Sequence, residues 1–307
     1  MAVLSLEVQH GLARWSPPGD KTMKIEELKH KIPEVCAAAR VIVQHHGHTR
    51  KFAKHIVALA IKQVEGLTDV ELVDFVGTKI GRMIGYKTKP DYSIFSKVRS
   101  RAEPEMFEDL NNWILQDRLK ERRIRLIAQD STDVPAFSRK DKHARTGHRT
   151  PSKREQEDAN GNANEMFFGY KLHAIVDAEN EIPIGFYIAP GNRNDKIFFG
   201  ELIGQVRKKF RLAFGAKYLG DSAYDSTDIR EYLHYHGIKD VVAINGRGHR
   251  KSATPKDPEY GKRWAIERAF SRLKEVFGLA KNRFVGMKKV SIHIHSCLTA
   301  YLMTYLM

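Results

Sequence analysis

The first third of the chain repeats apolar residues at helical spacing. Between Ile25 and about Leu119 they recur every three to four positions, which places them on one face of an α-helix. Thr68 and Asp69 are both suited to cap the segment that follows them, and Pro104 suits a first helical turn. We therefore predict a small bundle with helices at residues 25–45, 48–65, 68–76, 91–102 and 104–120.

After residue 121 the pattern changes from helical spacing to alternation. The run RIRLIAQDSTDV predicts a strand that stops at an acid, Asp130 or Asp133, and AKYLGDSAYDS predicts a short strand that ends at Asp221. FFGYKLHAIVD and EIPIGFYIAPG, joined by the turn signal DAEN, predict an antiparallel hairpin. Helical runs and the apolar strand DVVAIN fill the remainder. This order of elements predicts a mixed α/β domain over residues 121–307.

One predicted helix combines a polar stripe with an apolar face. Tyr260, Arg263, Glu267 and Lys274 follow one another at spacings of three, four and seven residues. At about 100° per residue they fall at roughly 0°, 300°, 340° and 320°, so one acid is flanked by two cations. The apolar side consists of Ile266, Ala269, Phe270, Leu273, Val276 and Phe277. The alternative is an ordinary amphipathic helix, in which Glu267 pairs with Arg263 and the other charges face water.

Several polar residues in apolar surroundings are expected to have structural roles. His173 lies in a predicted strand, and His293 and His295 lie in the apolar segment KKVSIHIHSCLTAYLMTYLM, so we expect them to pack rather than to bind metal. That segment should pack on the sheet as a closing helix. Either Asn194 or Asp195 should cap the helix that follows the hairpin.

Two stretches lack the apolar content that a packed core requires. Residues 1–22 end in the turn cluster RWSPPGDKT, and we expect a loosely ordered lead, with Met23 as an alternative start of translation. Residues 138–165 are polar, rich in turn residues and basic in their first half. They form either a solvated loop or a flexible basic arm that becomes ordered on DNA.

The overall charge points to a polyanionic partner. The 307 residues carry a formal net charge of +15, with a pI near 9.7, which favours nucleic acid over a membrane. A generally basic surface without such a partner is the alternative. Cys36 and Cys297 lie far apart, without zinc-ligand spacing, which suits a reducing cytoplasm. Because no apolar run reaches about 18 residues and the start is no convincing signal peptide, we expect a soluble cytoplasmic protein.

The pattern Tyr260-x2-Arg263-x3-Glu267-x6-Lys274 resembles the signature of the DDE transposases that insertion sequences encode. DST at the end of the first strand and GDSAYDS after a later one resemble the first and second catalytic motifs of that family, and GYKLH and GNRND are similar to segments between them. The resemblance implies a ribonuclease-H-like mixed sheet flanked by helices, preceded by an all-α region. It identifies Asp130, Asp221 and Glu267 as catalytic metal ligands, with Asp133 as the fallback for Asp130.

The family resemblance also implies cofactors and partners. Three carboxylates at one sheet edge suit Mg²⁺, with Mn²⁺ as a substitute, and two ions about 4 Å apart can activate water and stabilise the leaving oxygen of a phosphodiester. The segment LTDVELVDFVG and the later KPDYSIFSKVRSRA resemble the helical region that binds terminal inverted repeats, which implies that role for residues 23–120. Arg263 and Lys274 are then expected to hold DNA phosphates near the scissile bond, and Tyr260, also assigned to DNA binding, to support that contact.

Three functions are therefore compared. The first is a transposase that binds insertion-sequence ends, cleaves the double-stranded DNA there, and joins the 3′ end to target DNA within a self-associated synaptic complex at the nucleoid. The second is a non-catalytic DNA-binding protein derived from such an enzyme. The third is a metal-dependent nuclease without strand transfer. The transposase is the function that we predict.

Overall fold

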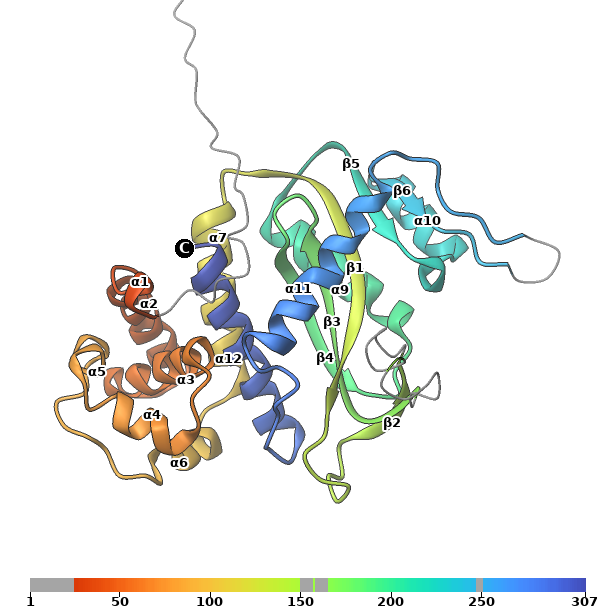
Figure 1. Cartoon of the computed structure of the whole chain (residues 1–307). Helices are drawn as coiled ribbons and strands as arrows, with labels where there is room; N and C mark the ends of the chain where they lie inside the picture. The colour runs from red at the N-terminus through yellow and green to blue at the C-terminus, as the bar shows by residue number, and fades with distance from the viewer. Residues whose placement is uncertain (1–24, 150–156, 158–164, 247–250) are drawn as a thin grey trace, which may run out of the picture.

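The computed structural model places a helical region beside a mixed sheet, with long helices between them (Figure 1). It describes residues 25–149, 157, 165–246 and 251–307. The predicted lead, residues 1–22, lies outside the described residues, as does most of the tract after His148.

The predicted all-helical region is present. Its elements are α1 Ile25–Leu28, α2 Ile32–His45, η1 Arg50–Phe52, α3 Ala53–Glu65, α4 Asp69–Phe75, α5 Lys79–Ile84, α6 Ile94–Arg101 and α7 Pro104–Leu119. The predicted helix 25–45 is interrupted, because Pro33 in the first turn of α2 has no N–H to donate to the preceding turn. Thr68 caps α4 in a reciprocal hydrogen-bonded pair with Glu71. The short helix α5 was not predicted.

The six-stranded sheet has the mixed topology that was predicted. Its strands are β1 Arg123–Pro135, β2 Arg145–His148, β3 Met166–Asp177, β4 Ile182–Pro190, β5 Arg211–Gly220 and β6 Lys239–Val242. The order is β2-β3-β1-β5-β6, and β4 also pairs with β3. β1, β5 and β6 are parallel, whereas β3 is antiparallel to β1 and β4. This is the ribonuclease-H-like arrangement, with the hairpin β3–β4 on one side of β1.

Two predictions about the strands were wrong in detail. β1 does not stop at Asp130 but continues to Pro135, because its second half pairs with β3 as far as Pro135 opposite Gly169. The tract 138–165 is not wholly a loop, since Arg145–His148 adds a short strand to the outer edge of β3. Residues 150–156 and 158–164 of that tract lie outside the described residues, so the predicted basic arm stays a prediction.

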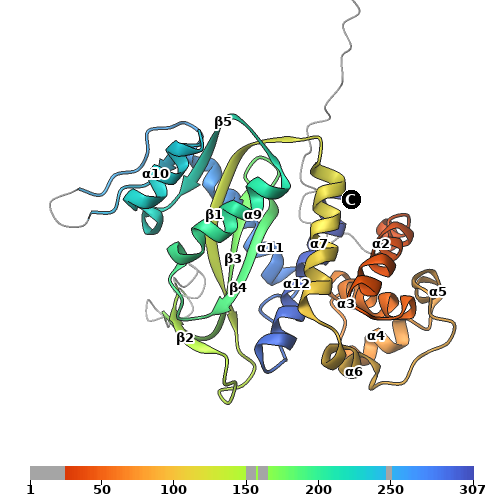
Figure 2. The same ribbon diagram turned by 180° about the vertical axis from the view of Figure 1, so that it is seen from behind.

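Helices cover both faces of the sheet. α11, Trp264–Glu275, packs against β1 and β3 on the face that is in front in Figure 1, and α9, Phe199–Lys209, packs against β3 and β4 on the opposite face, seen in Figure 2. The shorter elements are η2 Asp195–Phe198, η3 Ser222–Tyr224, α10 Thr227–Tyr235 and η4 Tyr260–Arg263. Asn194 caps η2, as predicted, by accepting a hydrogen bond from the Lys196 backbone.

The closing helix α12, Met287–Tyr305, is shared between the helical region and the sheet. It packs against α7, α3 and β4, and almost all of its side chains are buried. Asn111 of α7 is buried against it, accepting a hydrogen bond from Thr299 at 2.6 Å and donating to the His295 carbonyl at 3.3 Å. His293 and His295 are packed inside, as predicted. One hydrophobic core therefore runs from the helical region into the sheet.

Candidate active site

The strand register brings two of the predicted aspartates level with each other. In the parallel pairing of β1 with β5, Ala128 lies opposite Leu219, so Asp130 and Asp221 each follow two residues later. The pairing with β5 ends at this point, which leaves that side of β1 open beside Asp130. Asp221 directly follows β5 and caps η3 by accepting a hydrogen bond of 2.8 Å from the Ala223 backbone. Both carboxylates therefore lie at the same edge of the sheet.

Asp130 lies in a confined and acidic environment. Its side chain is 20% exposed, and one carboxylate oxygen accepts a hydrogen bond of 2.7 Å from the Ser131 backbone. Burial raises the pKa of Asp130 well above its ordinary value, and the charges of Glu267 and Asp221 raise it further. The three predicted carboxylates are thus close enough to influence one another electrostatically.

Glu267 reaches the same site from α11. The buried residues Ile266, Ala269, Phe270 and Leu273 hold this helix on the sheet, so the polar side that bears Glu267 lies beside them. Arg263 Nη1 lies 3.4 Å from Glu267 Oε1 and 3.9 Å from Asp130 Oδ2. One guanidinium therefore offsets the charge of two of the three carboxylates.

The predicted polar stripe is not on one continuous α-helix. Tyr260 and Arg263 lie in the 3₁₀ helix η4, and α11 begins only at Trp264. Tyr260 still contacts Arg263, and burial raises the pKa of its hydroxyl, with the nearby Asp221 charge acting in the same direction. Lys274 lies two turns beyond Glu267, where its ammonium pairs with Asp133 Oδ1 at 2.7 Å.

A fourth carboxylate, Asp195, adjoins the site and was not among the predicted site residues. Its Oδ1 accepts hydrogen bonds from Ser131 Oγ at 2.8 Å and from Lys171 Nζ at 3.0 Å. Its charge adds to the rise in the pKa of Asp130. Ser131 thus joins two carboxylates, through its backbone to Asp130 and through its hydroxyl to Asp195. The only sequence signal was the segment GNRND, which indicated a helix cap.

His173 is buried beside Asp195, as the strand pattern predicted. Its Nδ1 lies 3.4 Å from Asp195 Oδ1, and its ring packs against Phe198 with the ring centres 4.3 Å apart. Burial lowers the pKa of His173 to about 4, although the Asp195 charge opposes that change. The imidazole is therefore neutral at physiological pH and contributes packing rather than charge.

The donor set suits a hard divalent cation, but the side chains are not gathered around one point. Within the described residues, no three His, Cys, Asp or Glu side chains form a group that could hold a metal ion. Arg263 supplies the positive charge between Asp130 and Glu267. Burial, with the Glu267 and Asp221 charges in addition, disfavours the charged form of Asp130, and a bound cation would favour it. Carboxylate oxygens are the ligands that Mg²⁺ or Mn²⁺ prefers. The residues present therefore fit such an ion by their chemistry.

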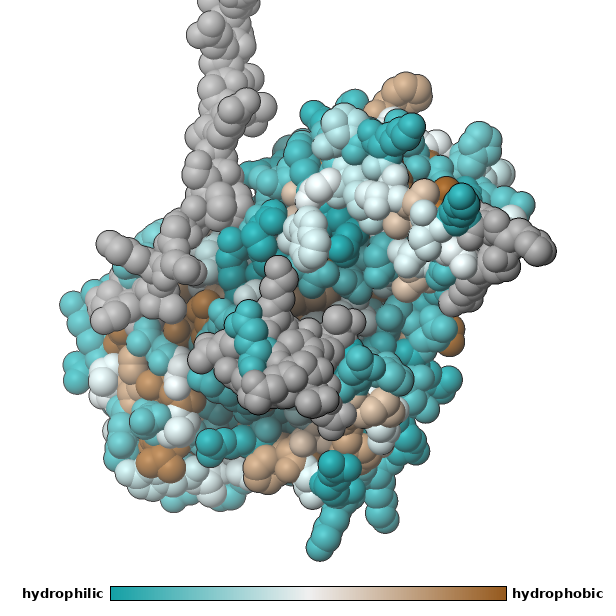
Figure 3. Space-filling model, turned by 45° about the vertical axis from the view of Figure 1, so that its right-hand side comes forward, coloured by the Kyte–Doolittle hydropathy of each residue, from teal (hydrophilic) through white to brown (hydrophobic). Residues whose placement is uncertain are grey.

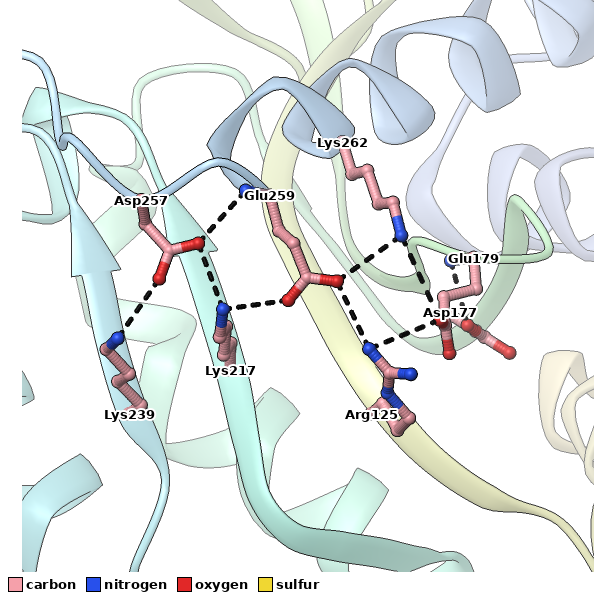
Figure 4. Close-up of polar contacts among 8 residues, drawn as sticks. All are labelled: Arg125, Asp177, Glu179, Lys217, Lys239, Asp257, Glu259 and Lys262. Atoms are coloured by element: carbon pink, nitrogen blue, oxygen red, sulfur yellow. Dashed lines mark hydrogen bonds and ion pairs between the residues drawn. The ribbon is translucent and has the colours of Figure 1, made fainter.

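A network of ion pairs connects residues 257–259, which directly precede η4, to the strands of the sheet (Figure 4). Asp257 accepts from Lys239 at 3.1 Å and from Lys217 at 3.0 Å. Glu259 lies 2.8 Å from Lys217 and 3.1 Å from Arg125. The three cations come from β6, β5 and β1. Because η4 begins directly after Glu259, the network fixes where Tyr260 and Arg263 enter the site.

The network should weaken in acid. The Glu259 backbone and the Lys217 ammonium lower the pKa of Asp257 to about 2, from an ordinary 3.8. A carboxyl whose pKa is lower in the folded state stabilises the fold above its unfolded pKa, and this contribution disappears as the pH falls from about 4 towards 2. The melting temperature of Asp257→Asn should therefore be below that of the wild type at pH 6 and converge with it near pH 2. A difference that does not change with pH would contradict this role.

The surface is mostly hydrophilic on the face that Figure 3 shows, with smaller hydrophobic patches over the helical region. In the described part of the chain, no helix is both long enough and apolar enough to cross a membrane.

Comparisons with known proteins identify a family. Residues 121–303, more than half of the chain, match the family model described as "Transposase DDE domain". No curated protein matches the chain. One similar solved structure is the cryo-EM structure of a piggyBac transposase synaptic complex with hairpin DNA, at 10% identity and a TM-score of 0.45. The alignment covers 84% of this chain and 66% of that one, so this chain spans slightly less than two thirds of the solved protein.

Proposed function

Because the chain belongs to the family of transposases with a DDE domain, we propose that it cleaves DNA at the ends of a mobile element and joins the 3′ ends to target DNA. The observation that supports this most directly is the strand register that sets Asp130 of β1 level with Asp221 after β5, together with Arg263, which lies beside both Asp130 and Glu267 of α11. The raised pKa of Asp130, to which the Glu267 and Asp221 charges contribute, is typical of a functional site.

In this proposal Asp130, Asp221 and Glu267 hold Mg²⁺, or Mn²⁺ in its place. The ion supplies charge that polarises the phosphodiester and lowers the pKa of the attacking water. The chain's own residues orient the DNA. Arg263, which pairs with Asp130 and Glu267 in the absence of DNA, is placed to bind a backbone phosphate, and its contact with Tyr260 supports that position.

The remaining parts of the proposal concern the partners. Residues 23–120 bind the terminal inverted repeats of the element, and two or more copies of the chain assemble with the paired ends. The net charge of +15 supports contact with two DNA segments, the element end and the target. The DDE domain over residues 121–307 then carries out cleavage and joining.

The direct test is incubation of the full chain with Mg²⁺ and labelled DNA that carries the ends of its own element. Joined products are expected. Nicks without joining would replace the proposal with a nuclease, and binding without either product would replace it with a non-catalytic DNA-binding protein.

The basic residues of the motif should matter for DNA rather than for the fold. Arg263→Ala and Lys274→Ala should each weaken binding to cleaved ends by about 10- to 100-fold, which corresponds to the loss of a charge-assisted hydrogen bond. They should also impair joining, and both variants should remain folded. The control is Lys208→Ala, which removes a charge from α9 on the other face of the sheet. Joining at the wild-type rate by Arg263→Ala and Lys274→Ala would assign these residues to salt bridges alone.

A further inference from the structure

A basic hollow lies in the helical region, away from the acidic site. It has a volume of about 770 Å³ and is formed by α2, η1, the start of α3, the end of α5, the segment after α5 and the start of α6. Five cationic residues line it: Arg40, Arg50, Lys51, Lys54 and Lys87. No acidic residue is among the residues that line it.

In the part of the chain that the structure describes, the five cations of the hollow have no carboxylate partner, whereas some other cations of the helical region do. Elsewhere in the helical region, Lys62 and Arg99 pair with Asp69, and Lys89 pairs with Asp74. Within the described residues, none of the five cations of the hollow forms an ion pair. Arg50 donates a hydrogen bond of 2.8 Å to the Gln44 amide, which orients the guanidinium without neutralising it. Among the described residues, the positive charge of the hollow is therefore not compensated by an ion pair.

The floor of the hollow holds one of these cations in place. Lys54 Nζ lies 4.5 Å from the centre of the Tyr86 ring, and the buried Tyr86 hydroxyl shares a hydrogen bond of 2.6 Å with His55 Nδ1. Burial lowers the pKa of His55 to about 4, so this imidazole adds no charge at neutral pH. Burial and the adjacent Lys51 also lower the pKa of Lys54. Lys54 is partly buried, whereas the other four cations are exposed, and a bound anion would favour the charged form of Lys54.

We propose that this hollow binds the phosphate backbone of double-stranded DNA. The proposal rests on the proposed function, and it names the surface through which the helical region would grip an element end. Five cations around a wide, open hollow match a row of phosphates better than one small anion. Contacts to the backbone position a protein on DNA without reading its sequence. The hollow is therefore expected to supply affinity and salt dependence rather than recognition of particular bases.

The test compares two triple variants of the full chain. Lys51→Ala/Lys54→Ala/Lys87→Ala removes three charges from the hollow. Lys120→Ala/Lys208→Ala/Arg211→Ala removes three charges from another basic surface, beside α7 and α9. Affinity for an end duplex is measured at several salt concentrations. Loss of three phosphate contacts should make the slope of log K against log salt shallower by about 2.7, at about 0.9 for each contact. The second variant should keep a slope close to that of the wild type.

The other possible outcomes show whether the hollow alone, or the proposed function as well, is refuted. Thermal melts establish that both variants are folded. If the wild type fails to bind DNA, the proposed function and the hollow fail together. If the wild type cleaves and joins but the hollow variant binds with an unchanged slope, only the hollow is refuted. Equal losses in both variants would mean that net charge alone is responsible, and this also refutes it. Inorganic phosphate could raise the melting temperature of the wild type while the hollow variant binds DNA as tightly as the wild type does. The hollow would then bind small anions rather than DNA, and the proposal would be overturned.

Discussion

Asp130→Asn, Asp221→Asn and Glu267→Gln are each expected to abolish cleavage and joining while DNA binding is retained. Each substitution keeps the size of the side chain and a carbonyl oxygen, but removes the negative charge that a divalent cation requires. Binding should hold or tighten, because an acid is removed from a site that faces phosphate. The measurement is cleavage of a labelled end duplex in Mg²⁺ and in Mn²⁺, beside DNA affinity in the absence of metal.

Thermal melts distinguish this role from a structural one. The raised pKa of Asp130 means that its charge is disfavoured in the folded state, so Asp130→Asn should keep or raise the melting temperature without metal. If the three carboxylates served only to stabilise the fold, these substitutions would lower the melting temperature. Asp133→Asn is the matched control on the same strand, because Asp133 pairs with Lys274. A folded Asp130→Asn protein that still cuts, beside an inactive Asp133→Asn protein, would move the first ligand to Asp133.

Glu181→Ala is expected to cause the largest loss of stability among the variants outside the acidic site. The Glu181 carboxylate, in the turn between β3 and β4, accepts hydrogen bonds from Arg268 and Arg272 of α11. Its backbone carbonyl accepts one of 2.7 Å from Tyr301 of α12. Charge-assisted hydrogen bonds contribute about 1.5–3 kcal/mol, so we expect a loss of about 2 kcal/mol in the free energy of unfolding, measured in urea. Cleavage should fall as well, because α11 carries Glu267.

Two control variants separate the contribution of the Glu181 carboxylate from other effects of the Glu181→Ala substitution. Glu179→Ala removes an acid two residues earlier in the same turn, where the partners Arg125 and Lys262 are 3.8 and 4.0 Å away, and it should cost much less. Glu181 has a φ of 59°, in the left-handed region that favours glycine. Glu181→Gly should therefore be more stable than Glu181→Ala by about 1 kcal/mol. Equal stability of Glu179→Ala and Glu181→Ala would show that the link to α11 contributes nothing specific.

The elements with a strong local period could be predicted from the sequence. The helix spacing before Leu119, the hairpin of β3 and β4, and the burial of one face of α11 all follow from residues near one another in the chain. The second half of β1 could not be predicted in this way. The residues DSTDVP are polar and end in proline, and they are extended because they pair with β3, about forty residues later.

The electrostatic partners were the least predictable part of the site. Lys274 pairs with Asp133, and Asp195 joins Ser131, across distances in the sequence that no local pattern spans. The azimuths calculated for Tyr260 and Arg263 assumed one regular helix, whereas these residues form a 3₁₀ turn before α11. Arg263 nevertheless reaches Glu267, because the two residues are still one turn apart. The pairing of Arg263 with Glu267 therefore survives the change of backbone from an α-helix to a 3₁₀ turn.

The shared position of α12 has a consequence for how the protein is synthesised. The helices of the N-terminal region complete their packing against residues 287–305, so their apolar surfaces stay uncovered until the ribosome has made that segment. At about 5–20 residues per second, the time between the synthesis of α7 and the synthesis of α12 is on the order of 10–40 s. During this time the nascent chain exposes the surfaces of α3 and α7 that α12 later buries. We therefore expect a fragment that ends before α12 to aggregate more readily than the full chain.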